Sequence, residues 1–205
     1  MKLYLSSYKL GNEVERLKEL LPANKKVAFI PNALDFAVDL ARRAQSEQGD
    51  IEQLEKLGLT VERIDLREYF GQAGVLREKI NECGLCWVRG GNVFVLRQAM
   101  KLSGFDEIIK SKVTDSNFLY GAYSAGVCVL APTLHGYELV DDSKVTPYGD
   151  LPLEWNGLNL IDYAVLPHFQ SEHEESEQVT LAVEYMKENR LPYKTLRDGE
   201  VIIIE

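Results

Sequence analysis

Long hydrophobic runs and an excess of positive charge are both missing from this chain. The longest apolar runs, such as Val201 to Ile204, are far too short to span a membrane, because a membrane-spanning helix needs about 20 apolar residues. Lys and Arg number 23 against 32 Asp and Glu, which gives a net charge of −9. No basic stripe interrupts this acidic balance. The sequence therefore predicts neither a membrane partner nor a nucleic-acid partner.

Cysteine is scarce, and the N-terminus lacks the apolar stretch of a secretory signal. Three cysteines are an odd number, and we expect reduced thiols in a cytoplasmic protein. Cys83 and Cys86 are spaced like a redox pair or half of a zinc site. They close a helix-like run and enter an apolar one, whereas a redox pair opens a helix. We therefore expect buried thiols.

The chain contains 45% hydrophobic and 27% charged residues, an ordinary balance for a folded protein. Short β-like runs alternate with longer helix-like runs, and no linker divides residues 1–205. This pattern predicts a single α/β domain with a doubly wound, mostly parallel sheet and helices on both faces. The expected strands are Lys2–Ser6, Lys26–Pro31, Thr60–Asp65, Leu85–Val88, Phe118–Tyr123, Ala164–Pro167 and Val201–Ile204. The expected helices are Glu13–Leu21, Asp35–Leu57, Val75–Glu82, Val93–Ser103, Phe105–Ser111 and Glu174–Asn189. Between Ala131 and Asn159, Pro and Gly residues predict hairpins and loops at one edge of the sheet.

The most informative segment is Phe118 to Leu130, where an apolar strand runs into Ser124 and then into a helix-like run. A nucleophile held on such a sharp turn needs small neighbours, and the chain supplies them on both sides of the serine. The turn also directs the backbone N–H of Ala125 at an incoming carbonyl oxygen. The usual G-x-S-x-G pattern is broken, since Ala122 replaces its first glycine. A serine in a tight turn or at a helix N-cap is the alternative.

A second glycine-containing turn, Arg89 to Asn92, also lies between an apolar strand and a helix-like run. Its two glycines allow the backbone to approach a ligand, so it is a candidate for a second oxyanion donor. A tight turn without a ligand is the alternative. The segment matches neither of the common phosphate-binding loops, so we expect no nucleotide cofactor.

A serine nucleophile requires a base, and His168 follows a predicted strand, as Ser124 does. His168 can thus share the sheet edge with the serine, although a hydrogen-bonded structural histidine is the alternative. His168 and His173 also lie among glutamates, which could indicate a metal cluster. Their spacing fits none of the common helical metal motifs, so we expect no metal.

Three motifs in this order resemble peptidase family S51, the serine peptidases typified by dipeptidase E. They are Arg89 to Phe94, Tyr123 to Gly126 followed by Ala131 to Thr133, and Leu166 to Phe169. The resemblance implies a doubly wound fold related to class I glutamine amidotransferases. It also implies hydrolysis of short peptide substrates by a serine, a histidine and a carboxylate, without a cofactor. Known members cleave dipeptides with an N-terminal aspartate, and a related branch degrades cyanophycin.

Carried over to this sequence, the resemblance assigns Ser124 as the nucleophile and His168 as the base. The backbone N–H groups of Gly91 and Ala125 become the oxyanion donors. For the third member, Asp198 matches an acid that precedes a glycine in a late loop.

Asp141 is the second candidate for the third acid, because the family's other acid lies near this position, shortly after the elbow helix. Residues 169–177 contain four glutamates and no arginine. This run predicts a weaker preference for N-terminal aspartate than in the family, unless Arg89 or Arg197 supplies a cation. It could instead hold a free α-ammonium group.

Two other functions remain open at this stage. Ala122 and the displaced third acid also suit a ligand-binding protein without catalytic activity on the same fold. A small-acyl esterase would use the same nucleophile. The oligomeric state does not follow from the sequence.

Overall fold

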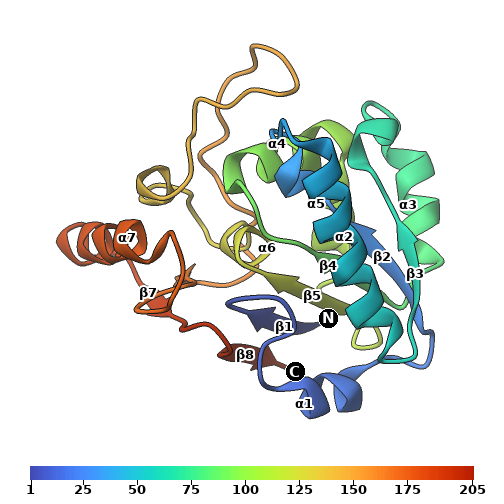
Figure 1. Cartoon of the computed structure of the whole chain (residues 1–205). Coiled ribbons are helices and arrows are strands. Elements are labelled where there is room, and N and C mark those ends of the chain that lie inside the picture. The colour runs from blue at the N-terminus through green and yellow to red at the C-terminus, as the bar shows by residue number, and fades with distance from the viewer.

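The computed structural model describes all residues from 1 to 205 and contains a twisted six-stranded sheet (Figure 1). The strand order is β3-β2-β4-β5-β1-β8, and every neighbouring pair is parallel except β1 with β8. The strands of this sheet are β1 Lys2–Ser6, β2 Lys26–Ile30, β3 Thr60–Arg63, β4 Leu85–Val88, β5 Leu119–Tyr123 and β8 Val201–Ile204. Because five of these strands run in the same direction, their carboxyl ends lie at one edge of the sheet, where α/β folds place their sites.

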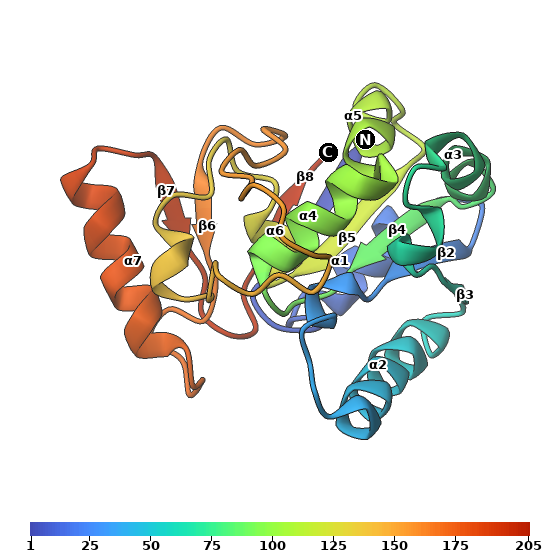
Figure 2. The ribbon, with the colours of Figure 1, turned by 90° about the horizontal axis from the view of Figure 1, so that it is seen from above.

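Helices cover both faces of the sheet, as the alternating pattern predicts. Figure 2 shows α3, α4 and α5 on one face and α1 and α2 on the other. The apolar core is split accordingly into a cluster of 41 buried residues and a second cluster of 11. The helices are α1 Val14–Leu20, α2 Leu40–Glu55, α3 Ala73–Asn81, α4 Val93–Ser103, α5 Phe105–Ser111, α6 Ala125–Cys128 and α7 Ser176–Glu188. No helix is long and apolar enough to cross a membrane.

The central strands are apolar on both faces because both faces are covered. All residues of β4 and β5 are buried. All seven expected strands are found within two residues of their predicted bounds. Helix α2 begins at Leu40 because a 3₁₀ turn, η1 Asn32–Leu34, and Asp39 as N-cap precede it.

A second, two-stranded sheet contains β6 Ala164–Leu166 and β7 Tyr193–Thr195, which pair in parallel. Figure 2 shows this sheet and α7 gathered beside the main sheet, on the side away from α2 and α3. The expectation that His168 follows a strand of the main sheet is therefore wrong. Its strand, β6, belongs to the smaller sheet.

The segment 131–159 forms loops but no hairpins. It contains a short 3₁₀ turn, η3 Tyr137–Leu139, and one isolated bridge between Thr133 and Asn156. The Arg97 guanidinium donates to the carbonyl oxygen of Asn156 at 2.8 Å and fixes the end of this loop against α4. The prolines and glycines that suggested hairpin turns here separate irregular segments instead.

Candidate functional site

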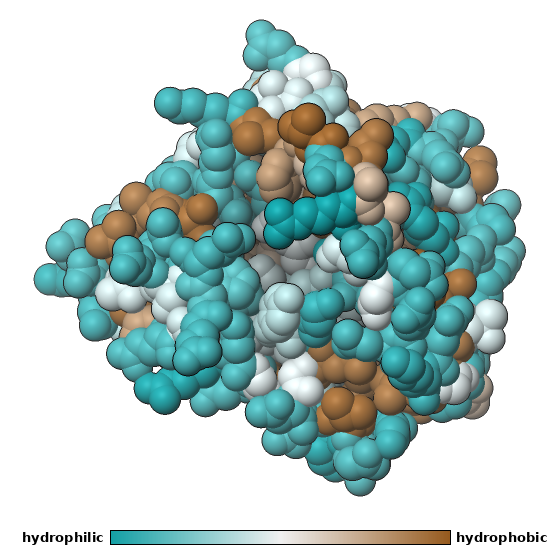
Figure 3. Space-filling model, viewed as in Figure 1, coloured by the Kyte–Doolittle hydropathy of each residue, from teal (hydrophilic) through white to brown (hydrophobic).

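A cavity of about 480 Å³ opens at the carboxyl ends of β1, β2, β4 and β5. The loops that follow these strands line it together with residues between 168 and 175. Figure 3 shows a hollow near the middle of the drawn face, with hydrophilic side chains around it and hydrophobic ones gathered above and below. Both Ser124 and His168 line the cavity.

Ser124 lies on the sharp turn between β5 and α6, with φ of +48° and ψ of −120°. A non-glycine residue adopts a positive φ at a cost, which indicates that the surroundings hold this turn in place. Gly126 shows how tight the turn is, because a Cβ there would lie 2.3 Å from the carbonyl oxygen of Val88. The small residues around the serine are thus needed to bring β4 and α6 together.

The backbone N–H groups of Gly91, which lines the cavity with Ser124, and of Ala125, which follows Ser124 in the chain, donate no hydrogen bond within the protein. Gly91 has φ of +142°, and a Cβ there would lie 2.4 Å from the carbonyl oxygen of Ala33. The next residue, Asn92, donates its N–H to that same carbonyl at 2.9 Å. The turn after β4 is therefore fixed against the turn after β2, and only glycine fits at position 91.

His168 is 99% buried and lies against Asp198. Its Nδ1 is 2.6 Å from Asp198 Oδ1. Since a carboxylate only accepts, Nδ1 carries the proton, and Nε2 is left with a free lone pair. Burial lowers the pKa of His168, with a contribution from His173, although Asp198 opposes the shift. The imidazole is therefore neutral and able to accept a proton near pH 7.

Ser7 and Ser171 hold this pair in place, and sequence reasoning missed both. Ser7 Oγ accepts the backbone N–H of His168 at 2.9 Å and donates to Asp198 Oδ1 at 2.8 Å. The backbone N–H of Asp198 donates to Ser171 Oγ at 2.8 Å. The signal for Ser7 was its place at the end of an apolar strand, where polar residues face a site in α/β folds.

The structure places Ser124 and His168 in the same cavity, but no hydrogen bond joins them. Catalytic hydrogen bonds are often long in the absence of substrate. Asp141 lines a smaller pocket beside Ser124 and His168, but its Oδ2 accepts the backbone N–H of Val93 at 2.8 Å and no hydrogen bond joins it to His168. Burial raises the pKa of Asp141 to about 7. Asp198, and not Asp141, is the acid in contact with His168.

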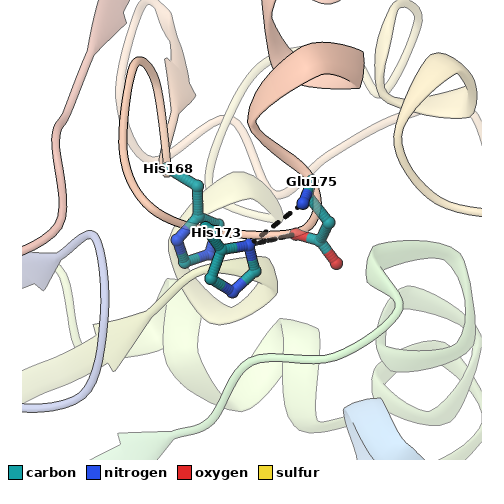
Figure 4. Close-up of side chains that lie close together, drawn as sticks. All are labelled: His168, His173 and Glu175. Carbon is teal, nitrogen blue, oxygen red and sulfur yellow. Dashed lines mark hydrogen bonds and ion pairs between the residues drawn. The ribbon is translucent and has the colours of Figure 1, made fainter.

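His173 stacks on His168, with ring centroids 3.7 Å apart and ring planes 9° apart. Figure 4 shows the two rings with Glu175 beside them, whose Oε2 is 3.9 Å from each of the facing ring nitrogens. The lone pair of an imidazole lies in the ring plane, so two nearly parallel rings cannot both direct a lone pair at one ion. His173 Nδ1 also accepts the backbone N–H of Glu175 at 3.3 Å. The two stacked rings are therefore poorly arranged to bind one metal ion together.

Charged groups of both signs line the cavity, including Arg89 and two glutamates, Glu174 and Glu175. Arg89 is 4% exposed, and its Nε and Nη1 have no hydrogen-bond partner. Arg197 donates to Gln170 at 2.7 Å and does not line the cavity. Of the two cations considered for the substrate, Arg89 is thus the one at the site.

The three cysteines are free and buried, as expected from the sequence. Burial raises the pKa of Cys83 to about 11, and it also raises the pKa values of Cys86 and Cys128 well above the ordinary thiol value. The thiols are therefore protonated near neutral pH and are poor nucleophiles. Cys128 lies in the helix that follows Ser124, where it packs between α6 and β6 with its Sγ 3.5 Å from Val165 O.

Comparison with solved structures finds the same fold elsewhere. A Listeria monocytogenes protein assigned provisionally as peptidase E superposes with a TM-score of 0.71 at 24% identity, covering 100% of this chain and 98% of that one. A peptidase from an acI-B1 actinobacterium gives a TM-score of 0.65 at 17% identity, covering 100% of this chain and 83% of that one. The architecture is the class I glutamine amidotransferase-like fold.

Sequence comparison with curated proteins and with a family model shows the family to which the chain belongs. An uncharacterized peptidase of Listeria monocytogenes is 30% identical over 156 residues, which cover 72% of this chain and 67% of that protein. An uncharacterized peptidase of Pasteurella multocida is 27% identical over 151 residues, which cover 71% of this chain and 66% of that protein. The model of peptidase family S51 matches residues 6–205. With nearly its whole length matched, the chain belongs to peptidase family S51.

Proposed function

We propose that this protein is a serine peptidase that hydrolyses very short peptides, with Ser124 as nucleophile, His168 as base and Asp198 as third member. The observation that carries the proposal is the 2.6 Å contact between Asp198 and His168, which leaves Nε2 free in the cavity that Ser124 also lines. Membership of a peptidase family supports a peptide as substrate. The positive φ of Ser124 supports a nucleophile elbow.

In the proposed acylation step, Ser124 Oγ attacks the peptide carbonyl carbon while His168 Nε2 takes the hydroxyl proton. The free N–H groups of Gly91 and Ala125 donate hydrogen bonds to the carbonyl oxygen and stabilise the negative charge that develops on it. His168 then gives its proton to the departing amine nitrogen as the C–N bond breaks. Asp198 orients the imidazole and stabilises the imidazolium, and stays ionised itself.

In the deacylation step, a water molecule takes the place of the departed amine. His168 Nε2 accepts a proton from this water, whose oxygen attacks the acyl carbon of the ester on Ser124. When the tetrahedral intermediate collapses, Ser124 Oγ recovers its proton from His168 and the acid product leaves. The same two N–H groups serve both oxyanions.

The charge distribution of the cavity supports a substrate that carries a carboxylate. Arg89 is buried with two guanidinium nitrogens, Nε and Nη1, that have no hydrogen-bond partner, and an unsatisfied buried donor is costly. A carboxylate is the group that a guanidinium binds best. The run of glutamates argued for the opposite preference, but only Glu174 and Glu175 of its four glutamates line the cavity, where Arg89 lies as well. An acidic first residue of the peptide, which known members of the family prefer, is therefore the substrate that we propose.

The test is hydrolysis of a dipeptide panel, including Asp-Leu, Ala-Leu and Lys-Leu, by wild type, Ser124→Ala, His168→Ala and the double variant. We expect each single substitution to lower kcat by about 10⁴-fold or more, and the double variant to be little worse than the worse single one. A fluorophosphonate probe should label wild type at Ser124. Additive losses, or labelling elsewhere, would contradict the shared mechanism, and faster cleavage of small acyl esters than of any peptide would favour an esterase.

A further inference from the structure

The carboxylate of Glu175 stands out among the acidic groups of the cavity because nothing in the protein binds it. It accepts no hydrogen bond, and only its backbone N–H is engaged, by His173 Nδ1. Its side chain is 33% exposed and faces the catalytic histidine, with Oε2 3.9 Å from His168 Nε2. That distance is too long for a hydrogen bond. The lone pairs of Glu175 are thus available to a ligand in the cavity.

The other acidic residues that line the cavity differ in exposure or are already engaged. Asp39 caps helix α2 and accepts the backbone N–H of Arg42 at 2.9 Å. Glu174 is exposed, so solvent screens its charge. Glu175 is partly buried, which raises its pKa and strengthens the pull on any cation that reaches it. Figure 4 shows the carboxylate beside the two stacked imidazoles, and no lysine or arginine forms an ion pair with it.

We propose that Glu175 accepts the free α-ammonium group of the peptide substrate and so restricts the enzyme to peptides with an unblocked N-terminus. This assignment rests on the proposed function. An ammonium group has three donors and a positive charge, and it matches an unclaimed carboxylate in a partly buried site. The scissile carbonyl of the first residue is two bonds from its amino nitrogen. A group beside His168 Nε2 is therefore close enough to hold that nitrogen while Ser124 attacks.

Binding can be measured without catalysis in the Ser124→Ala protein. We expect calorimetric titration to show that Ala-Leu binds at least about tenfold more tightly than propionyl-leucine, which differs by lacking the ammonium group. Adding Glu175→Gln, which keeps size and polarity but removes the charge, should abolish most of this difference. Adding Glu172→Gln, an exposed neighbour outside the cavity, should leave the difference as it was.

Kinetics provide the second readout, in the Ser124 enzyme. Alanine p-nitroanilide should have a higher kcat/KM than propionyl p-nitroanilide, and Glu175→Gln should lower only the first, by about tenfold or more. Equal losses on both substrates would overturn the proposal and make Glu175 a positioning residue for His168. A loss of the difference in Glu174→Gln but not in Glu175→Gln would also overturn it. If the ammonium preference appears in binding while no variant or wild type hydrolyses a peptide, the proposed function fails and the ammonium site stands.

Discussion

Asp198 is the acid hydrogen-bonded to His168, and a conservative substitution there is the sharpest test of the third member. Its Oδ1 accepts from both His168 Nδ1 and Ser7 Oγ. In Asp198→Asn the side chain can present an N–H₂ donor to Nδ1 and favour the wrong tautomer. We expect kcat to fall by several orders of magnitude, on the order of 10⁴ at most, with the far-UV circular dichroism unchanged.

Asp141→Asn is the matched control for that substitution. Asp141 accepts the N–H of Val93, and an asparagine oxygen can accept the same bond. The kcat of this variant should therefore stay within a few fold of wild type. If Asp141→Asn were the more damaging of the two in folded protein, Asp141 would replace Asp198 as the third member.

Substitution of Arg89 tests which residue determines the preference for an acidic first residue in the substrate. Arg89→Met keeps much of the apolar stem and removes the charge, so it should lower kcat/KM for Asp-Leu by about tenfold or more and leave Ala-Leu much less affected. Arg197→Met, at a cation outside the cavity, should change neither value. Equal effects of Arg89→Met on both dipeptides would show that Arg89 is needed for folding or for Asp50 and Tyr123, which it neighbours, and not for a substrate carboxylate.

Among the elements, helix α4 couples an ionisable group to stability. Asp141 binds the first N–H of this helix, yet burial raises its pKa from 3.8 to about 7. The unfolded chain releases this proton near pH 4 and the folded protein near pH 7. The contribution of the protonated carboxyl is therefore complete below pH 4 and is lost progressively as the pH rises to 7.

Melting temperatures from pH 4 to pH 7.5 check this linkage. Relative to wild type, Asp141→Asn should gain stability across the window, by at least about 2 °C in Tm, which corresponds to about 1 kcal/mol in a chain of this size. Asp162→Asn, at an exposed carboxyl, serves as the control and should track wild type. A constant offset between Asp141→Asn and wild type at every pH would show that Asp141 is ionised in the folded protein throughout.

The elements that sequence patterns predicted well are those with local signals. Strands β4 and β8 and helices α4 and α5 have their predicted bounds, because apolar runs and periodic charge mark them without help from the rest of the fold. Strand β7 was missed, since a three-residue strand that follows a proline and contains a lysine has no pattern of its own. Its pairing with β6 supplies what its sequence lacks.

At the scale of the molecule, the α/β architecture followed from alternation, and Ser124 from its strand, turn and helix context. The route by which His168 reaches the site did not follow from either. It depends on a contact between Ser7 and His168, which are 161 residues apart in sequence, and on a second sheet that no local pattern marks. The roles of His173 and Glu175 likewise depend on a stacking geometry that spacing alone does not encode.

The division into two sheets has a consequence for how activity and folding are linked. The proposed nucleophile ends a strand of the large sheet, whereas the proposed base and acid leave the small sheet on adjacent strands, β6 and β7. Ser7, which follows β1 of the large sheet, joins the two sheets, because its hydroxyl forms hydrogen bonds with both His168 and Asp198. The proposed catalytic residues are thus brought together only when the two sheets are correctly placed relative to each other. A small displacement of one sheet relative to the other would separate the proposed nucleophile from the proposed base without breaking the strand pairing within either sheet.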